Sequence, residues 1–121
     1  MKFCWTTVCV KEMAESLRFY QDIVGLPLMR QSKPTPDMEL SFLGSGETQV
    51  ELICDTAVSR IQYGDSISMG FQCESLETIV NMLKERKIPV LTGIIQPNPS
   101  IRFFYMLDPN GVKIQFVEQI K

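Results

Sequence analysis

The order of predicted elements runs through this chain twice, and such internal repetition restricts the possible folds more than any local propensity does. Trp5 corresponds to Ser68, which lies 63 positions further along the chain (5 to 68). Each half of the pattern gives one strand, one helix and then three strands. The sequence therefore predicts an α+β fold of two tandem βαβββ units, at 1–54 and 66–121, with a linker at 55–65.

Hydrophobic periodicity indicates where the elements of each unit begin and end. Met13, Leu17 and Tyr20 share one helical face, and Gly25 is expected to end that helix. Ser75 is expected to cap the second helix. Strands are expected at 3–10, 26–30, 38–43 and 48–54, and again at 66–73, 89–95, 101–107 and 112–118. Helices are expected at 12–24 and 75–86, and proline-containing loops at 33–37 and 96–100.

Size and composition indicate one ordinary globular domain covering residues 1–121. Apolar residues make up 45% of the chain and charged residues 21%, which is neither disordered nor membrane-spanning composition. The net charge is −2 and no basic block occurs, so we expect no nucleic-acid partner and no membrane partner. Residues 1–5 lead straight into a strand pattern without a secretory apolar segment, so we expect a cytoplasmic protein.

The chain contains no histidine, and this excludes several kinds of chemistry. Ser-His-Asp and Cys-His catalysis and every histidine-ligated metal site are ruled out. Acid–base chemistry would have to use Asp, Glu, Lys, Tyr or Cys side chains. None of the four cysteines forms a C-x-x-C pair, so we interpret them as small apolar residues, with a catalytic thiol as the weaker alternative.

Two segments resemble one known superfamily. Residues 16–26 read S-L-R-F-Y-Q-D-I-V-G-L, and residues 107–118 read L-D-P-N-G-V-K-I-Q-F-V-E. Both resemble segments of the vicinal oxygen chelate superfamily, which includes glyoxalase I, bleomycin-resistance proteins and extradiol dioxygenases. The resemblance covers essentially the whole chain. It implies a curved mixed sheet around a ligand cup, and a homodimer, but it does not specify an activity.

Strand alternation, combined with this resemblance, assigns side chains to the cup. The first and last strands of each unit supply them, whereas the phase of strand 101–107 stays open. The expected ligand-binding residues are Trp5, Thr7, Cys9, Gln49, Glu51, Ser68, Gln72, Lys113 and Gln115.

The resemblance places the four metal-ligand positions of the superfamily at Trp5, Glu51, Ser68 and Gln115. The superfamily usually has His or Gln, Glu, His and Glu there, so only Glu51 keeps the usual identity. The indole nitrogen of Trp5 is a hydrogen-bond donor and does not bind a metal. We therefore expect a degenerate site without a metal cofactor, which argues against metal-dependent glyoxalase I chemistry.

Three functions follow from these residues. The leading hypothesis is a protein that binds a small organic ligand without a catalytic metal, through Trp5, Glu51, Gln72 and Gln115. The rival is a divergent lyase, isomerase or dioxygenase-like enzyme, such as a lactoylglutathione lyase-like protein, with Glu51 as base. The third is a regulatory or interaction module whose cup is closed by Trp5. Two roles are equally open for Trp5: it either stacks on a ligand or fills the vacant metal position. Glu51 is either a ligand-binding group or a solvated residue held by Gln115 or Lys113.

Overall fold

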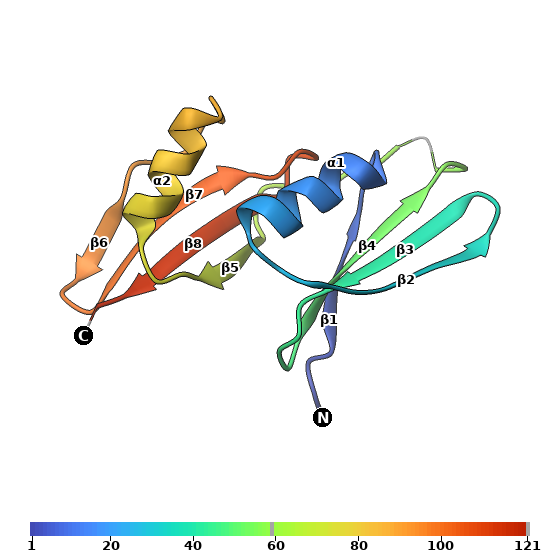
Figure 1. The fold of residues 1–121 in the computed structure, drawn as a ribbon, viewed down its shortest axis with the longest axis horizontal. Coiled ribbons are helices and arrows are strands. Elements are labelled where there is room, and N and C mark those ends of the chain that lie inside the picture. The colour runs from blue at the N-terminus through green and yellow to red at the C-terminus, as the bar shows by residue number, and fades with distance from the viewer. Residues whose placement is uncertain (59, 121) are drawn as a thin grey trace. The chain divides into compact units, whose positions relative to one another are not determined.

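The computed structural model describes residues 1–58 and 60–120, and it divides into two compact units, Met1–Gln62 and Tyr63–Lys121 (Figure 1). Residue 59 of the predicted linker and residue 121 at the end of the second predicted unit lie outside the described residues. Both units have the βαβββ order, so the predicted fold class is confirmed.

The first unit builds one mixed sheet in the strand order β1-β4-β3-β2. Its elements are β1 (Trp5–Cys9), α1 (Met13–Arg18), the π-helical turn η1 (Phe19–Ile23), β2 (Leu28–Thr35), β3 (Met38–Leu43) and β4 (Gln49–Asp55). Strand β1 runs parallel to β4, whereas β4 and β2 are both antiparallel to β3. The parallel pairing requires a crossover connection, which α1 and the following strands provide.

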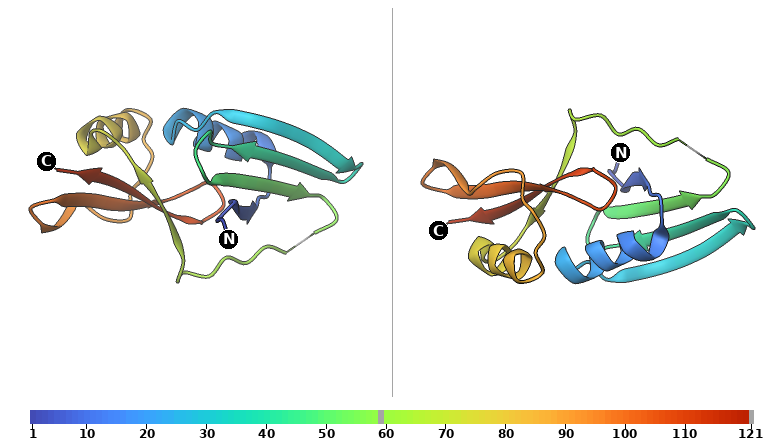
Figure 2. Two further views of the ribbon diagram at one scale, coloured as in Figure 1. Left: turned by 90° about the horizontal axis from the view of Figure 1, so that it is seen from below. Right: turned by 90° about the horizontal axis from the view of Figure 1, so that it is seen from above.

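The second unit repeats this plan in the strand order β5-β8-β7-β6. Its elements are β5 (Ser68–Gln72), α2 (Leu76–Glu85), β6 (Ile95–Asn98), β7 (Ile101–Leu107) and β8 (Lys113–Gln119). Helix α2 contacts β8 in this unit, as α1 contacts β4 in the first, so each sheet has one face next to its own helix (Figure 2). None of the helices in the described ranges is long and apolar enough to span a bilayer.

The core of each unit lies on the helix side of its sheet. In the first unit, the strand residues Val8, Val10, Val50 and Leu52 are buried, and they alternate with the residues expected to face the cup. In the second unit the buried strand residues are Phe104, Met106, Ile114 and Phe116. The phase of strand 101–107 is thereby resolved: Phe104 and Met106 face the core, and Phe103 and Tyr105 face the opposite side.

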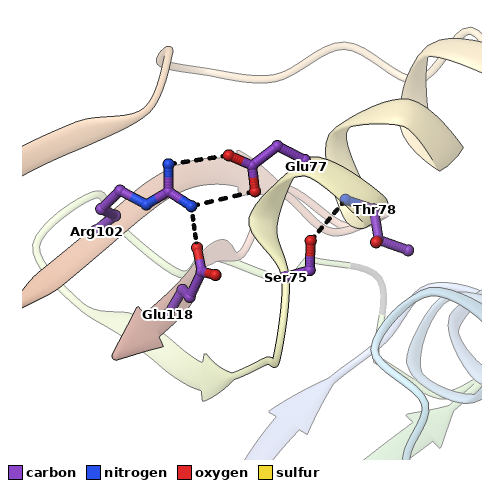
Figure 3. A network of polar contacts seen from close by, with 5 residues as sticks. All are labelled: Ser75, Glu77, Thr78, Arg102 and Glu118. Carbon is purple, nitrogen blue, oxygen red and sulfur yellow. Dashed lines mark hydrogen bonds and ion pairs between the residues drawn. The ribbon is translucent and has the colours of Figure 1, made fainter. Parts of the chain in front are cut away.

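The predicted helix ends are confirmed, with one difference in the first helix. The Ser75 hydroxyl accepts a hydrogen bond from the backbone N–H of Thr78 at 3.3 Å (Figure 3). Gly25 has φ +84°, a conformation that favours glycine, and it follows the end of η1. The last turn of the first helix widens to π geometry, because the Val24 N–H donates to the Phe19 carbonyl at 3.1 Å.

Two strand predictions were wrong, and both errors involve proline. The loop predicted at 33–37 lies largely in β2, which includes Pro34. Residues 89–95 were predicted as a strand, but the strand found in this part of the chain, β6, begins only at Ile95. It includes Pro97 and most of the loop predicted at 96–100. Strands β2 and β6 are edge strands. A proline is tolerated at a sheet edge because its missing N–H has no partner to lose on the outer side.

The turn between β7 and β8 determines how these two strands pair. One oxygen of Asp108 accepts hydrogen bonds from the backbone N–H groups of Asn110 and Val112, each at 2.8 Å. Gly111 has φ +99°, which a side chain would strain. The turn places Tyr105 directly opposite Gln115 in the antiparallel register.

Candidate functional site

The candidate site residues lie on the sheet face opposite the helix of each unit, which we call the cup face. In the first unit, Thr7 of β1 and Phe42 of β3 both pair with Glu51 of β4, and Arg30 of β2 pairs with Phe42. Paired residues in neighbouring strands point to the same side of a sheet. These four side chains therefore form a row across the first cup face, and Trp5 stands one alternation step from Thr7.

The Glu51 carboxylate is buried and is held by a hydrogen bond within its own unit. Its side chain is 8% exposed, and the Thr7 hydroxyl donates to one of its oxygens at 2.6 Å. Burying an ionised carboxylate is costly unless a donor compensates the lost water. Gln115 and Lys113, the partners considered from the sequence, belong to the second unit, where both contact Tyr105.

An aromatic pair lies next to this carboxylate. The Trp5 indole meets the Phe42 ring edge-on, with ring centroids 5.2 Å apart and an interplanar angle of 77°. The Arg30 guanidinium lies 4.0 Å from the centroid of the Phe42 ring, which is a cation–π distance. Phe42 is consequently only 6% exposed, whereas Trp5 is 44% exposed. Trp5 is thus anchored along one edge while much of its surface stays accessible in this chain.

Arg30 and Phe42 were not among the site residues predicted from the sequence. Alternation along β3 would have placed Phe42 beside Glu51 once the pairing of β3 with β4 was known. Arg30 had no such signal, because a β-bulge lies between Leu28 and Arg30. Leu28 pairs with the buried Leu43, and the bulge then turns Arg30 to the opposite face.

The cup face of the second unit is organised around Tyr105. The Gln115 side-chain amide donates to the Tyr105 hydroxyl at 3.2 Å, and the Lys113 ammonium lies 4.5 Å from the centroid of the Tyr105 ring. Phe103 meets the same ring edge-on at 5.7 Å. Gly70 pairs with Gln115, and a Cβ at Gly70 would lie 3.2 Å from the amide oxygen of Gln115. Glycine therefore leaves room for this amide.

The remaining predicted ligand residues are more scattered. Gln49 donates its amide to the Gly44 carbonyl at 3.0 Å, so this side chain is used in the β3–β4 turn. Gln72 lines a pocket of about 470 Å³ at the end of the second sheet, together with residues of β6, β7 and β8. Ser68 and Cys9 are exposed, Ser68 opposite Lys113 and Cys9 opposite Ile53.

The four positions assigned to metal ligands do not carry a suitable donor set. Trp5 presents only an indole N–H, and the Glu51 carboxylate already accepts a hydrogen bond from Thr7. In the second unit Gln115 offers an amide rather than a carboxylate. Zinc and nickel centres need several nitrogen, sulfur or carboxylate ligands. In residues 1–58 and 60–120, no cluster of three or more His, Cys, Asp or Glu side chains is placed to hold a metal ion.

A charged cluster lies on the helix side of the second sheet, away from the cup face. The Arg102 guanidinium bonds both oxygens of Glu77 on α2, at 2.9 and 3.1 Å, and also pairs with Glu118 of β8 (Figure 3). The hydrogen bond from Arg102 lowers the pKa of the Glu77 carboxyl below its usual 4.5. Burial, and secondly the negative charge of Glu118, raises the pKa of the Cys73 thiol. We interpret this cluster as an anchor that holds α2 on its sheet.

The fold and these two faces define a class of protein. Residues 2–116 match the model of the Glyoxalase/Bleomycin resistance protein/Dioxygenase superfamily. Because the match spans nearly the whole chain, the protein belongs to that superfamily, as the resemblance of its sequence segments implied.

Two curated relatives are similar along nearly their whole length. A lactoylglutathione lyase of Haemophilus influenzae is 29% identical, with 98% of this chain and 93% of that protein covered. A probable lactoylglutathione lyase of Synechocystis is 23% identical, with 93% of this chain and 92% of that protein covered.

Solved structures show the same fold at lower identity. A glyoxalase family protein from Bacillus cereus is 15% identical and superimposes with a TM-score of 0.87, covering 100% of this chain and 95% of the other. The trypanothione-dependent glyoxalase I of Leishmania major is 20% identical and has a TM-score of 0.81, covering 98% and 86%. At these identities the likeness establishes the fold, and the function must be argued from the side chains.

Proposed function

We propose that this protein binds a small organic ligand on its cup faces through stacking and hydrogen bonding, without a catalytic metal. The main support for this proposal is the environment of Glu51, the one metal-ligand position that keeps the residue usual in the superfamily. Its buried carboxylate accepts the Thr7 hydroxyl at 2.6 Å, and the Trp5–Phe42 pair lies beside it. A carboxylate in such surroundings is suited to accept hydrogen bonds from a bound molecule.

Trp5 supports a binding role for the first cup face. Its ring is fixed against Phe42 along an edge, and 44% of its surface is exposed. A pre-positioned aromatic side chain offers a large contact area to a planar or apolar ligand at little cost in conformational entropy. We therefore favour stacking over the alternative in which Trp5 only fills a vacant metal position.

Tryptophan fluorescence tests this proposal directly, because Trp5 is the single tryptophan of the chain. Titration with a library of small aromatic compounds should change the Trp5 emission in a saturable way. The apparent affinity should be the same after exhaustive chelation with EDTA. Loss of binding on chelation, with recovery on adding Zn²⁺ or Ni²⁺, would contradict metal-free binding.

The rival proposal is a divergent lyase, and one observation favours it. The Haemophilus influenzae relative, at 29% identity over nearly the whole chain, is a lactoylglutathione lyase. In that case Glu51 would act as the base, since its carboxylate is a proton acceptor beside a binding surface. Turnover of lactoylglutathione that is abolished by Glu51→Gln but retained in Glu39→Gln, which makes the same change at an exposed position of β3, would establish the enzyme. Absence of turnover, with ligand binding retained, would favour the binding protein.

A closed cup would make the protein an interaction or regulatory module instead. If Trp5 occupied the cup itself, no compound would change its emission, and quenching by acrylamide would be weak. Efficient quenching together with a saturable ligand response would exclude the module.

We also propose a homodimer in the cytoplasm, with no nucleic acid or membrane as partner. The dimer rests on the resemblance to the superfamily. Light scattering on the purified chain should give twice the mass of 13.8 kDa.

A further inference from the structure

The second cup face has an isolated positive charge. Among the described strand residues that the register places on this face, Lys113 is the only one with a charged side chain. In the described part of the chain no acidic side chain forms an ion pair with Lys113. The acids of neighbouring segments are engaged elsewhere: Glu118 pairs with Arg102 on the helix side, and Asp108 accepts backbone N–H groups in its turn.

Hydrogen-bond donors gather around this charge. The Lys113 ammonium lies over the Tyr105 ring at 4.5 Å, and the Tyr105 hydroxyl accepts a hydrogen bond from the Gln115 amide at 3.2 Å. Because the hydroxyl oxygen already accepts a hydrogen bond from Gln115, its own proton is directed to another acceptor. The ammonium group carries three donors and no acceptor. The Tyr105 hydroxyl and the Lys113 ammonium are therefore two different hydrogen-bond donors, and both lie next to the aromatic ring of Tyr105.

The local packing keeps these groups in place. Gly70 leaves space for the Gln115 amide, since a Cβ there would come within 3.2 Å of its oxygen. Phe103 supports the Tyr105 ring from the side at 5.7 Å. Lys113 and Gln115 stand two residues apart on β8, so both side chains point to the cup face. A pre-positioned donor set of this kind matches the oxygen atoms of an anion.

We propose that the second cup face binds the anionic oxygen group, a carboxylate or sulfonate, of an organic ligand whose apolar part lies against Phe103 and Tyr105. Lys113 and the Tyr105 hydroxyl would hold the anionic oxygens, and Gln115 positions the hydroxyl. This inference rests on the proposed function and adds to it the charge class of the ligand.

A matched pair of dyes tests the inference. 8-Anilinonaphthalene-1-sulfonate and N-phenyl-1-naphthylamine have the same ring system, but only the first carries a sulfonate. The intact protein should bind the sulfonate more tightly than the neutral dye. Lys113→Gln should weaken binding of the sulfonate about tenfold, because a charge-assisted hydrogen bond is lost, and should leave the neutral dye unchanged. Lys113→Arg should retain most of the affinity.

Two further variants separate a specific contact from a general loss of charge. Lys84→Gln removes the same charge from an exposed position on α2 and should change neither affinity. Tyr105→Phe keeps the ring and removes the hydroxyl, and should weaken the sulfonate about threefold without affecting the neutral dye. Circular dichroism confirms that each variant is folded.

The outcomes separate this inference from the proposed function. Equal affinity for the two dyes in the intact protein, or equal weakening of both dyes by Lys113→Gln, would overturn the inference while ligand binding stands. The same would follow if Lys84→Gln weakened the sulfonate as much as Lys113→Gln. If neither dye binds while other compounds still change the Trp5 emission, the inference is overturned and the proposed function stands. If no compound of the library binds either, both fail.

Discussion

The two units share one scaffold but differ in the chemistry of their cup faces. Glu51 of the first unit corresponds to Gln115 of the second, and Phe42 corresponds to Tyr105. The first face combines a buried carboxylate with an aromatic pair, whereas the second combines an amide, a phenol and a lysine. The repeated core fixes the strands, so the opposite faces are free to diverge. Function in this protein therefore resides in the differences between two copies of one unit.

The largest expected difference between the units is the loss of stability when the aromatic residue that pairs with the last strand is removed. That residue is Phe42 in the first unit and Tyr105 in the second. Phe42 is covered by Arg30 and Trp5 and is 6% exposed. Phe42→Ala should lower the free energy of unfolding by about 3 kcal/mol, because it leaves a cavity. Tyr105→Ala should cost roughly half as much, since Tyr105 is only half-buried. Urea denaturation of both variants measures the two losses, and equal losses would contradict the asymmetry.

The next largest effect on stability is expected from the hydrogen bond between Thr7 and the Glu51 carboxylate on the first cup face. Thr7→Val removes the hydroxyl that donates to Glu51 and should destabilise the protein by about 1–2 kcal/mol, because a buried carboxylate loses its donor. Combining Thr7→Val with Glu51→Leu should cost less than the sum of the single changes. Additive losses in this double-mutant cycle would show that the two side chains are not coupled.

The helix sides of the two units should respond differently to acid. Arg102 lowers the pKa of Glu77, so this carboxylate stabilises the fold at pH values above 4.5, and the stabilisation is lost as the pH falls through the lowered value. The stability gap between the intact protein and Arg102→Met should therefore narrow in acid. The position equivalent to Glu77 in the first unit is Ala14 (77 less 63), which has no carboxylate to form such an ion pair. Urea denaturation at neutral pH and below pH 4.5, with Lys84→Gln as control, measures the difference in unfolding free energy between the intact protein and Arg102→Met. A difference that does not change with pH would contradict a stabilising pair between Arg102 and the Glu77 carboxylate.

The smallest effect is expected where the second unit has glycine opposite its amide. Gly70→Ala would place a Cβ 3.2 Å from the amide oxygen of Gln115, and this flexible group can shift slightly. The hydrogen bond from Gln115 to Tyr105 should weaken, but alanine also restricts the unfolded chain more than glycine does, and this offsets the loss. The free energy of unfolding should therefore stay within about 0.5 kcal/mol of that of the intact protein. The Gln115 side-chain amide signals in an NMR spectrum should move. Unchanged signals would mean that Gly70 does not make room for this amide.

Much of the fold could be predicted from the sequence because the repeat and the strand periodicity are strong. Strands β3 and β7 have the bounds that the pattern predicted, and Ser75 caps α2 as predicted. The two proline-containing edge strands were misplaced, because a local pattern does not reveal which strand lies at an edge.

The candidate site was predicted only in part. Alternation placed Thr7 and Glu51 on one face, and the structure joins them by a hydrogen bond. Arg30 reaches the same face only through a β-bulge, which the sequence does not signal. Tyr105 was missed because neighbouring apolar residues on β7 left its phase open until the pairing with β8 was known.

The metal content of the freshly purified, tag-free protein tests the central claim most directly, since the claim is that Trp5 and Glu51 contact a ligand rather than a metal. Elemental analysis should find far less than about one equivalent of zinc, nickel or iron per chain, because the donor set is too poor to retain one. Close to one tightly held equivalent that disappears in Glu51→Gln would contradict the account.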